Sequence, residues 1–310
     1  MAAGYEPVDI FWDGIVLLLV NIVLWLVSIP LGKTWPVDAI WSNFPIYQSA
    51  SVYIRDHGRG NRDRQVLVLC LVCLWGFRLT LNFVARGGIG SEDWRYANMR
   101  ARFGPRHFWW VSLFSVFLGQ SVFLFGASLS LYGALTKPTP LVGRDWIAFG
   151  ITLGSILLEA ISDIQMDRFI NQKKEKRTDK VIIDTGLWNW SRHPNYMGEI
   201  LFWWGLYLFS YSDNDGDNNY WWVVLGPVAL TLLIAVVSIK MMEDRQLAKK
   251  KQDFVAYRRR VGSALLLLPP FVNRKLGRCL YGSGDDSNDG NQDNNDGQEE
   301  PGNDVEEQSL

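Results

Sequence analysis

The chain has 310 residues, of which 48% are hydrophobic and 14% are aromatic, and its formal net charge is −1 at pH 7. The charged residues are clustered and leave long apolar runs between them, which is typical of a membrane protein and argues against a soluble globular domain. Three cysteines are too few for a disulfide scaffold, and three histidines without helical pairing offer no zinc triad, so we expect no metal site.

Six apolar runs approach the length needed to cross a bilayer. They cover residues 10–31, 65–84, 108–133, 146–167, 195–210 and 221–242. A hydrocarbon core of about 30 Å needs about 20 helical residues, and a chain in lipid must satisfy its backbone polar groups internally. We therefore predict an all-α, polytopic bundle of transmembrane helices. The first run lacks a basic leader and a small-residue cleavage site, so we interpret it as a retained span.

Residues 36–54 are less apolar, and they form either a seventh span or a re-entrant segment. Their polar residues include Asp38, Asn43 and Gln48. We favour a span, because seven spans place the basic 168–193 loop and the basic segment after residue 242 on the cytosolic side. The basic residues between 55 and 64 conflict with this topology whether the chain has six spans or seven.

Three carboxylates lie on one face of the helix predicted over 146–167. Glu159, Asp163 and Asp167 are spaced i, i+4, i+8. An ionised residue within a span costs about 2.5–3.5 kcal/mol on insertion scales, so this stripe needs cations or ligand donors. Asp167 lies near the helix end, where water can solvate it, and Glu159 lies deeper.

The segment around residue 194 has the features of an anion site. Pro194 fits the first turn of a helix, whose free N–H groups and dipole favour a negative ligand. Arg192 adds a planar fork for phosphate oxygens. Asn195 and Glu199 are four residues apart and share one face of that helix. The alternative is an interfacial helix start, with Arg192 reaching lipid headgroups.

The C-terminal part combines a basic stretch with an acidic tail. Residues 1–280 contain all 31 Lys and Arg, whereas residues 281–310 contain ten Asp or Glu and no Lys or Arg. A tail of this composition cannot bury enough apolar surface to fold. We predict a membrane domain over 1–280 and a disordered tail over 281–310. The tail is interpreted as a solvated extension, or alternatively as a docking segment for a protein partner.

The stretch GLWNWSRHPNYMGE at residues 186–199, together with the Asp163-Ile164-Gln165 helix before it, resembles the steroid 5-alpha-reductase-like membrane proteins, and more narrowly their uncharacterised branch. The resemblance extends over residues 10–272. Further matching positions are Asp38, Trp41, Trp75 to Leu79, Glu92 to Tyr96, Gln120, and Tyr257 to Pro269.

The resemblance implies a seven-helix bundle that binds NADPH from the cytosol and transfers hydride to the β-carbon of an activated C=C bond. The family's Asn-x-x-Gly-Glu string matches Asn195 and Glu199. Glu199 and Tyr196 are the candidate catalytic residues. The candidate cofactor-binding residues are Asp163, Asp167, Arg192, His193, Asn195, Arg258, Arg259 and Arg260.

Two departures from the family pattern argue against a steroid as the substrate. The family's Tyr that holds the substrate carbonyl would fall near Trp75, where this chain has no Tyr. The long Pro-Gly-rich loop of the steroid enzymes is replaced by Lys173 to Arg177. We therefore expect a lipophilic enone or alkene such as a sterol or polyisoprenoid. An apolar pocket would admit such a substrate and exclude water.

Two other readings remain open. Isoprenylcysteine carboxyl methyltransferases share the Arg-His-Pro-x-Tyr-x-Gly string, so S-adenosylmethionine is the alternative cofactor. A third reading is a non-catalytic membrane protein that binds lipid or cofactor. We expect membrane lipids and a lipophilic small molecule as partners and no nucleic acid. We also expect a location in the endoplasmic reticulum, with the C-terminus in the cytosol.

Overall fold

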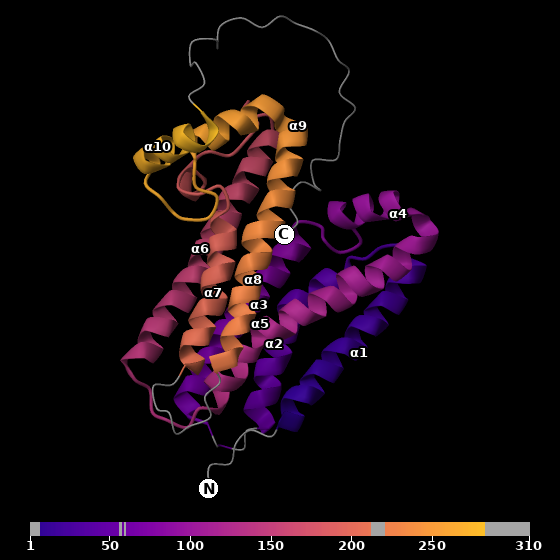
Figure 1. The fold of residues 1–310 in the computed structure, drawn as a ribbon, viewed down its shortest axis with the longest axis vertical. Coiled ribbons are helices and arrows are strands. Elements are labelled where there is room, and N and C mark those ends of the chain that lie inside the picture. Colours follow the sequence, from indigo (N-terminus) through magenta and orange to yellow (C-terminus); the bar gives the residue numbers. More distant parts are fainter. Residues whose placement is uncertain (1–6, 56–57, 59, 212–220, 283–310) are drawn as a thin grey trace, which may run out of the picture. The chain divides into compact units, whose positions relative to one another are not determined.

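The computed structural model describes residues 7–55, 58, 60–211 and 221–282, and within these it contains helices and no strand (Figure 1). Of the tail predicted over residues 281–310, the structure describes Tyr281, which is helical, and Gly282, and the rest lies outside the described residues. The elements are α1 Pro7–Leu31, α2 Pro36–Arg55, α3 Arg62–Ala85, α4 Trp94–Ser112, η1 Leu113–Leu118, α5 Gly119–Thr136, α6 Gly143–Lys174, η2 Gly186–Asn189, α7 Pro194–Ser210, η3 Trp221–Val224, α8 Leu225–Leu232, η4 Leu233–Ser238, α9 Ile239–Arg260 and α10 Pro270–Tyr281.

Five helical stretches in the described part of the chain are long and apolar enough to span a membrane. They are Ile10–Leu31, Arg62–Ala85, Trp94–Thr136, Gly143–Lys174 and Trp222–Arg260. They confirm the prediction of an all-α, multi-pass membrane protein. Helix α2 is less apolar than these stretches, and α7 has only 17 residues, so the count of seven spans stays a prediction.

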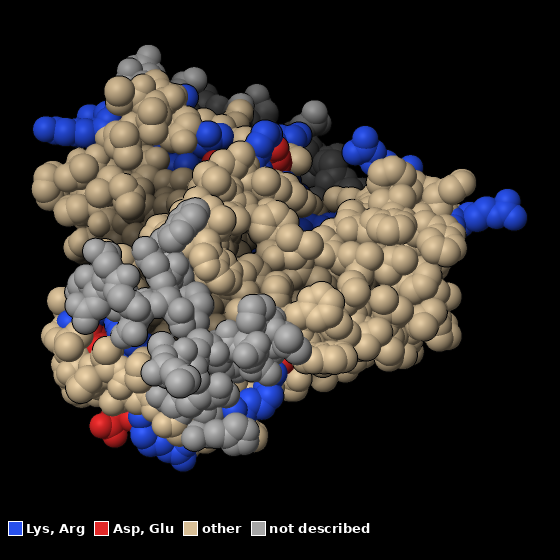
Figure 2. Space-filling view, turned by 60° about the horizontal axis from the view of Figure 1, so that its bottom comes forward, with Lys and Arg blue, Asp and Glu red and all other residues tan. Residues whose placement is uncertain are grey.

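The surface supports this assignment. Helix α1 exposes large apolar side chains such as Phe11, Leu19 and Val23, each more than half accessible. Most of the face drawn in Figure 2 is likewise neither acidic nor basic. Soluble monomers rarely expose apolar patches of this extent, whereas lipid tails cover them without cost.

The chain forms two compact units. Unit 1 contains the described residues up to Leu157 together with Gly198–Leu233. Within it, α2 packs against α3 and α5, and α8 packs against α5. Gly226 of α8 allows a close approach to α5, because a Cβ atom there would lie 2.1 Å from the carbonyl oxygen of Gly126.

Two ion pairs in unit 1 account for arginines that conflicted with the predicted topology. Arg55 Nη2 lies 2.6 Å from Asp13 Oδ2. Arg64 is fully buried and forms a bidentate pair with Asp145, at 2.9 and 3.0 Å. An arginine paired with a carboxylate forms a unit with little net charge. These two arginines are therefore weaker arguments against placing residues 55–64 on the non-cytosolic side.

Unit 2 contains Leu158–Met197 and the described residues from Ile234 onward. The loop before α7 is held on α6, because Leu187 N donates to Gln165 Oε1 (2.9 Å) and Trp188 Nε1 donates to the Ser162 carbonyl (3.2 Å). The acidic stripe of α6 and residues 192–197, which open α7, therefore belong to the same compact unit, whereas Glu199 belongs to unit 1.

Helix α9 is sharply kinked and does not run straight to its end. Lys251 has φ 35° and ψ −107°, which breaks the helical path. The residues after the kink fold back, so that Tyr257 packs in one cluster with Leu247 from before the kink. Helix α10, which the sequence did not predict, packs against α9 (Figure 1). This return brings the basic stretch at residues 258–260 back to the start of α9.

Candidate functional site

Arg192 is the centre of a buried polar cluster in unit 2, and its side chain is only 3% exposed. Its Nε donates to Glu243 Oε1 at 2.7 Å, and its Nη1 donates to the carbonyls of Val261 and Gly262 at 2.7 and 2.8 Å. Nη2 donates to the Tyr281 hydroxyl at 3.1 Å. These four bonds occupy most of the five N–H groups of a guanidinium. Arg192 thus ties α9, α10 and the loop between them to the start of α7.

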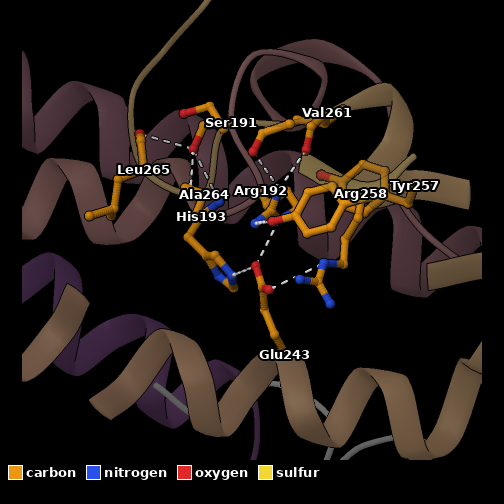
Figure 3. Close-up of polar contacts among 12 residues, drawn as sticks. Ser191, Arg192, His193, Glu243, Tyr257, Arg258, Val261, Ala264 and Leu265 are labelled. Carbon is orange, nitrogen blue, oxygen red and sulfur yellow. Dashed lines mark hydrogen bonds and ion pairs between the residues drawn. The ribbon is translucent and has the colours of Figure 1, made fainter. Parts of the chain in front are cut away.

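Three cationic or potentially cationic side chains lie near the carboxylate of Glu243. Figure 3 shows Arg192, His193 and Arg258 directed toward it. His193 Nε2 lies 3.4 Å from Glu243 Oε1, and Arg258 Nε lies 3.6 Å from Oε2. The guanidinium of Arg258 also lies over the Tyr281 ring, 4.1 Å from its centroid. In this cluster, hereafter the arginine cluster, positive partners compensate the charge of the carboxylate.

His193 is 8% exposed and stacks on Tyr196, with ring centroids 5.2 Å apart. Burial lowers the pKa of His193 below its ordinary value, because removing the imidazolium from water costs free energy. Glu243 opposes this shift, and the positive charge of Arg192 adds to it. Among the described residues we find no group of His, Cys, Asp and Glu side chains suited to a metal ion.

Several polar side-chain atoms of unit 2 are buried without a hydrogen-bond partner among the described residues. Among them are Oδ1 of Asn195, an acceptor, and Nε of Arg259, a donor. A buried polar atom left in this state costs about 1–3 kcal/mol, so it usually marks a place for water or for a ligand. Both residues were predicted to contact a cofactor.

The remaining predicted residues of unit 2 have different surroundings. Asp163 and Tyr196 are buried, at 6% exposure each, and Asp167 is partly exposed. Arg260 Nη1 pairs with Asp184 at 2.8 Å on the surface. The structure therefore brings Arg192, His193 and Arg258 together at Glu243, and Arg260 binds elsewhere.

Glu199 is held differently, within unit 1. Three indole N–H groups converge on its carboxylate: Trp203 Nε1 at 2.9 Å, Trp75 Nε1 at 3.1 Å and, at the long end of the range, Trp41 Nε1 at 3.5 Å. Trp75 and Trp203 are fully buried, and Trp75 stacks on Phe202 at a centroid distance of 4.7 Å. Among the described residues no Lys, Arg or His pairs with Glu199. We call this arrangement the indole cluster.

A second polar group of unit 1 contains Asp38, which lies one helical turn before Trp41 on α2. The Tyr96 hydroxyl donates to Asp38 Oδ1 at 2.9 Å and accepts from Gln120 Nε2 at 2.8 Å. Asp38 and Trp41 are three residues apart, so they lie on one face of α2. The same helix face thus contacts both the Tyr96 hydroxyl and the Glu199 carboxylate.

Sequence reasoning missed several of these contacts. Trp41, Asp38, Tyr96 and Gln120 belonged to the resemblance but had no assigned role. Glu243 had no assigned role either. Its position directly after the apolar 221–242 run was the available signal, since a carboxylate at that depth needs a partner.

Comparison with known proteins finds a matching family model and related sequences. A family model described as "Protein of unknown function (DUF1295)" matches residues 24–261. An uncharacterized protein of Schizosaccharomyces pombe is 26% identical over 241 residues, which cover 70% of this chain and 69% of that protein. No solved structure matches the chain.

A more distant similarity connects the chain to an enzyme. The protein-S-isoprenylcysteine O-methyltransferase of Saccharomyces cerevisiae is 29% identical over 107 residues, which cover 32% of this chain and 37% of the enzyme. The similarity thus covers a minor part of each protein.

Proposed function

Because the chain belongs to the DUF1295 family, which is the steroid 5-alpha-reductase-like family, we propose that it is a membrane-embedded reductase that uses NADPH to reduce a C=C bond of a lipophilic substrate. The indole cluster is the observation that carries this proposal. The substrate class we propose is a conjugated sterol or polyisoprenoid, and the location we propose is the endoplasmic reticulum, with the C-terminus in the cytosol.

The chemistry of Glu199 favours hydride transfer. Indole N–H groups are neutral donors, so they fix the carboxylate in place without neutralising its charge. NADPH supplies a hydride, and its nicotinamide ring becomes positive as the hydride leaves. A fixed carboxylate nearby stabilises that developing charge, and the stabilisation is strong in an apolar surrounding.

The same argument disfavours methyl transfer at Glu199. A sulfonium methyl donor is positive before the reaction and loses its charge in the transition state. A nearby carboxylate would stabilise the ground state more than the transition state and would slow the reaction. The methyltransferase reading nevertheless remains the second candidate, because the yeast enzyme shares 29% identity over 107 residues.

Tyr96 is our candidate for the proton donor, in addition to Tyr196. Reduction of an enone requires a proton as well as a hydride, and a hydroxyl near the carbonyl oxygen both polarises the bond and delivers the proton. Asp38 and Gln120 orient the Tyr96 hydroxyl, at 2.9 and 2.8 Å. For this step the Tyr96 hydroxyl would turn from Asp38 to the substrate and give up its proton, and a protonated Asp38 carboxyl, 2.9 Å away, would then return a proton to the Tyr96 oxygen.

The residues of unit 2 fit a charged cofactor. Residues 158–197 and 234–282 contain 18 Lys or Arg and nine Asp or Glu, a surplus of nine positive charges. Asn195 Oδ1 would accept from an amide or amino group, and Arg259 Nε would donate to a phosphate oxygen. Arg192 would act mainly by holding this region together, since its donors are already engaged.

The deciding experiment is a titration of the purified chain in lipid nanodiscs with NADPH and, separately, with S-adenosylmethionine. Isothermal calorimetry should give a clear preference for NADPH. Asn195→Ala should weaken NADPH binding by about tenfold, because a hydrogen bond from the cofactor to the buried Oδ1 of Asn195 is lost. Asn171→Ala, on the exposed end of α6, is the matched control.

Tighter binding of S-adenosylmethionine would overturn the reductase proposal. Binding of neither compound by a folded wild-type protein would favour the non-catalytic reading. Equal effects of the Asn195 and Asn171 substitutions would remove Asn195 from the site and leave the cofactor preference as measured.

A further inference from the structure

Helix α10 has one face that packs on unit 2 and another that is open. Asn273, on the inner face, is fully buried and bonds to the Ser263 N–H and to the carbonyls of Trp190 and Leu268, all at 2.9 Å. Gly277 allows close packing, because a Cβ atom there would lie 2.1 Å from the Arg259 carbonyl oxygen. The inner face therefore fixes the loop that carries the arginine cluster.

The outer face of α10 combines cations with large apolar side chains. Arg274, Lys275 and Arg278 are exposed. Phe271 lies on the same face and is 69% accessible, whereas Leu280, nine residues further along, lies on the opposite side of the helix and is 57% accessible. In the loop just before the helix, Leu266 is also 57% accessible. Basic and apolar side chains mixed on one helix are typical of helices that lie in the headgroup region of a membrane.

Contacts within unit 2 place α10 at the level where the apolar part of the last candidate span ends. The apolar run 221–242 is followed at once by Glu243. Glu243 binds Arg192, and Arg192 donates to the hydroxyl of Tyr281, the last residue of α10. A chain of two hydrogen bonds thus connects α10 to the end of a membrane-spanning stretch.

We infer that the outer face of α10 docks on anionic lipid headgroups of the membrane that the chain itself spans. Arg274, Lys275 and Arg278 complement the negative headgroups, and Phe271 and Leu266 enter the boundary between headgroups and acyl chains. Because the inner face of α10 holds Asn273 and Tyr281 against the arginine cluster, this docking also orders that cluster. The inference does not depend on which reaction the protein catalyses.

Cys279 provides a probe at the right place. It is exposed, and among the described residues the other cysteines are Cys70 and Cys73. The full chain carrying Cys70→Ala and Cys73→Ala would be labelled at Cys279 with a fluorophore and placed in nanodiscs of phosphatidylcholine, with or without phosphatidylserine. Spin-labelled lipid then quenches the fluorophore only where the label touches the bilayer.

Quenching should rise at least twofold when phosphatidylserine is present. The triple variant Arg274→Gln, Lys275→Gln and Arg278→Gln should lose this rise. The matched control Lys174→Gln, Lys176→Gln and Arg177→Gln removes three exposed cations from the end of α6 and the loop that follows it, and it should keep the rise. Circular dichroism and gel filtration establish that each variant is folded.

Three results would overturn the inference. Equal quenching in both lipid compositions would mean that α10 does not recognise anionic lipid. A rise that occurs only after deletion of residues 283–310 would mean that the acidic tail, and not lipid, covers this face in the full chain. A rise lost in the control triple variant would assign the effect to net charge rather than to α10.

Discussion

The two carboxylates Glu199 and Glu243 are both partly or largely buried, yet their surroundings differ in kind. Glu243 lies in the arginine cluster, with Arg192 at 2.7 Å, His193 at 3.4 Å and Arg258 at 3.6 Å. Glu199 lies in the indole cluster, with neutral N–H donors at 2.9, 3.1 and 3.5 Å. One carboxylate is charge-compensated, and the other is held in place with its charge intact.

This difference separates a structural role from a chemical one. A carboxylate paired with cations stabilises the fold, because removing either partner leaves an uncompensated buried charge. A carboxylate surrounded by neutral donors can still stabilise a positive charge that forms beside it. We therefore expect substitutions in the arginine cluster to affect stability and substitutions in the indole cluster to affect turnover.

The largest effect is expected for Arg192→Ala. The substitution strands the Glu243 carboxylate and two backbone carbonyls, so the free energy of unfolding should fall by about 3–5 kcal/mol. Thermal unfolding in detergent, with hydrogen exchange over residues 239–281, measures the loss. Arg177→Ala, at an exposed ion pair with Glu175, should change stability by less than about 1 kcal/mol. A comparable loss in both variants would contradict a special role for Arg192.

Glu199→Gln should reverse this pattern. The amide keeps the size of the side chain and its oxygen still accepts from indole N–H groups, but its NH2 group cannot accept from the indole that faces the other carboxylate oxygen. The free energy of unfolding should therefore fall by about 1–3 kcal/mol, which is less than for Arg192→Ala. NADPH-dependent turnover of a polyisoprenoid or sterol enone should fall by about 100-fold, because the negative charge is gone. Glu175→Gln is the control. Full turnover by the Glu199 variant would show that this carboxylate is not part of the chemistry.

A smaller effect is expected for Trp75→Phe. Phenylalanine keeps the stacking on Phe202 but removes one N–H donor from Glu199. Turnover should fall by about tenfold, which corresponds to the loss of one hydrogen bond to a charged group. The control is Trp146→Phe, since Trp146 is 57% exposed. If both variants behave alike, the indole cluster does not position Glu199.

The smallest expected effect is a dependence of stability on pH, and it arises from His193 in the arginine cluster. The pKa of His193 is lower in the folded chain than its ordinary value of 6.5, so the unfolded chain binds the proton more strongly. This contribution to stability is present above pH 6.5 and is lost as the pH falls below it, by at most about 1.4 kcal/mol per pH unit.

Unfolding temperatures measured from pH 7.5 to pH 5 test this sign. The variant His193→Gln should show a flatter dependence than the wild type. The variant His107→Gln, at an exposed position of α4, should keep the wild-type slope. A slope that is steeper in the His193 variant would contradict the proposed origin of the pH dependence.

Sequence reasoning located the helices better than it located their partners. The apolar runs at 10–31, 65–84 and 195–210 lie inside α1, α3 and α7. The last residue of each run agrees with the last residue of its helix to within one position. The turn at Lys251 and the helix Pro270–Tyr281 were missed. The first is a change of direction inside a helical pattern, and the second is too short and too charged to give a span signal.

The candidate site was predicted only in part. Glu199 was chosen as a carboxylate inside an apolar segment, and its contacts with indoles fit that choice, although its catalytic role stays a prediction. Arg192 was chosen as a phosphate ligand, and this role stays a prediction; in the structure its donors form a network of internal bonds. A sequence shows that a buried charge needs partners, but it does not show which partners it finds.

What the sequence determined by itself is the class of the protein. Long apolar runs must form helices because lipid offers no hydrogen bonds to the backbone, and this constraint acts locally along the chain. What only the tertiary structure decided is the pairing of its buried polar groups. Glu199 meets Trp75 across 124 positions and Arg192 meets Glu243 across 51, and such contacts depend on how the helices pack and not on any local period of the sequence.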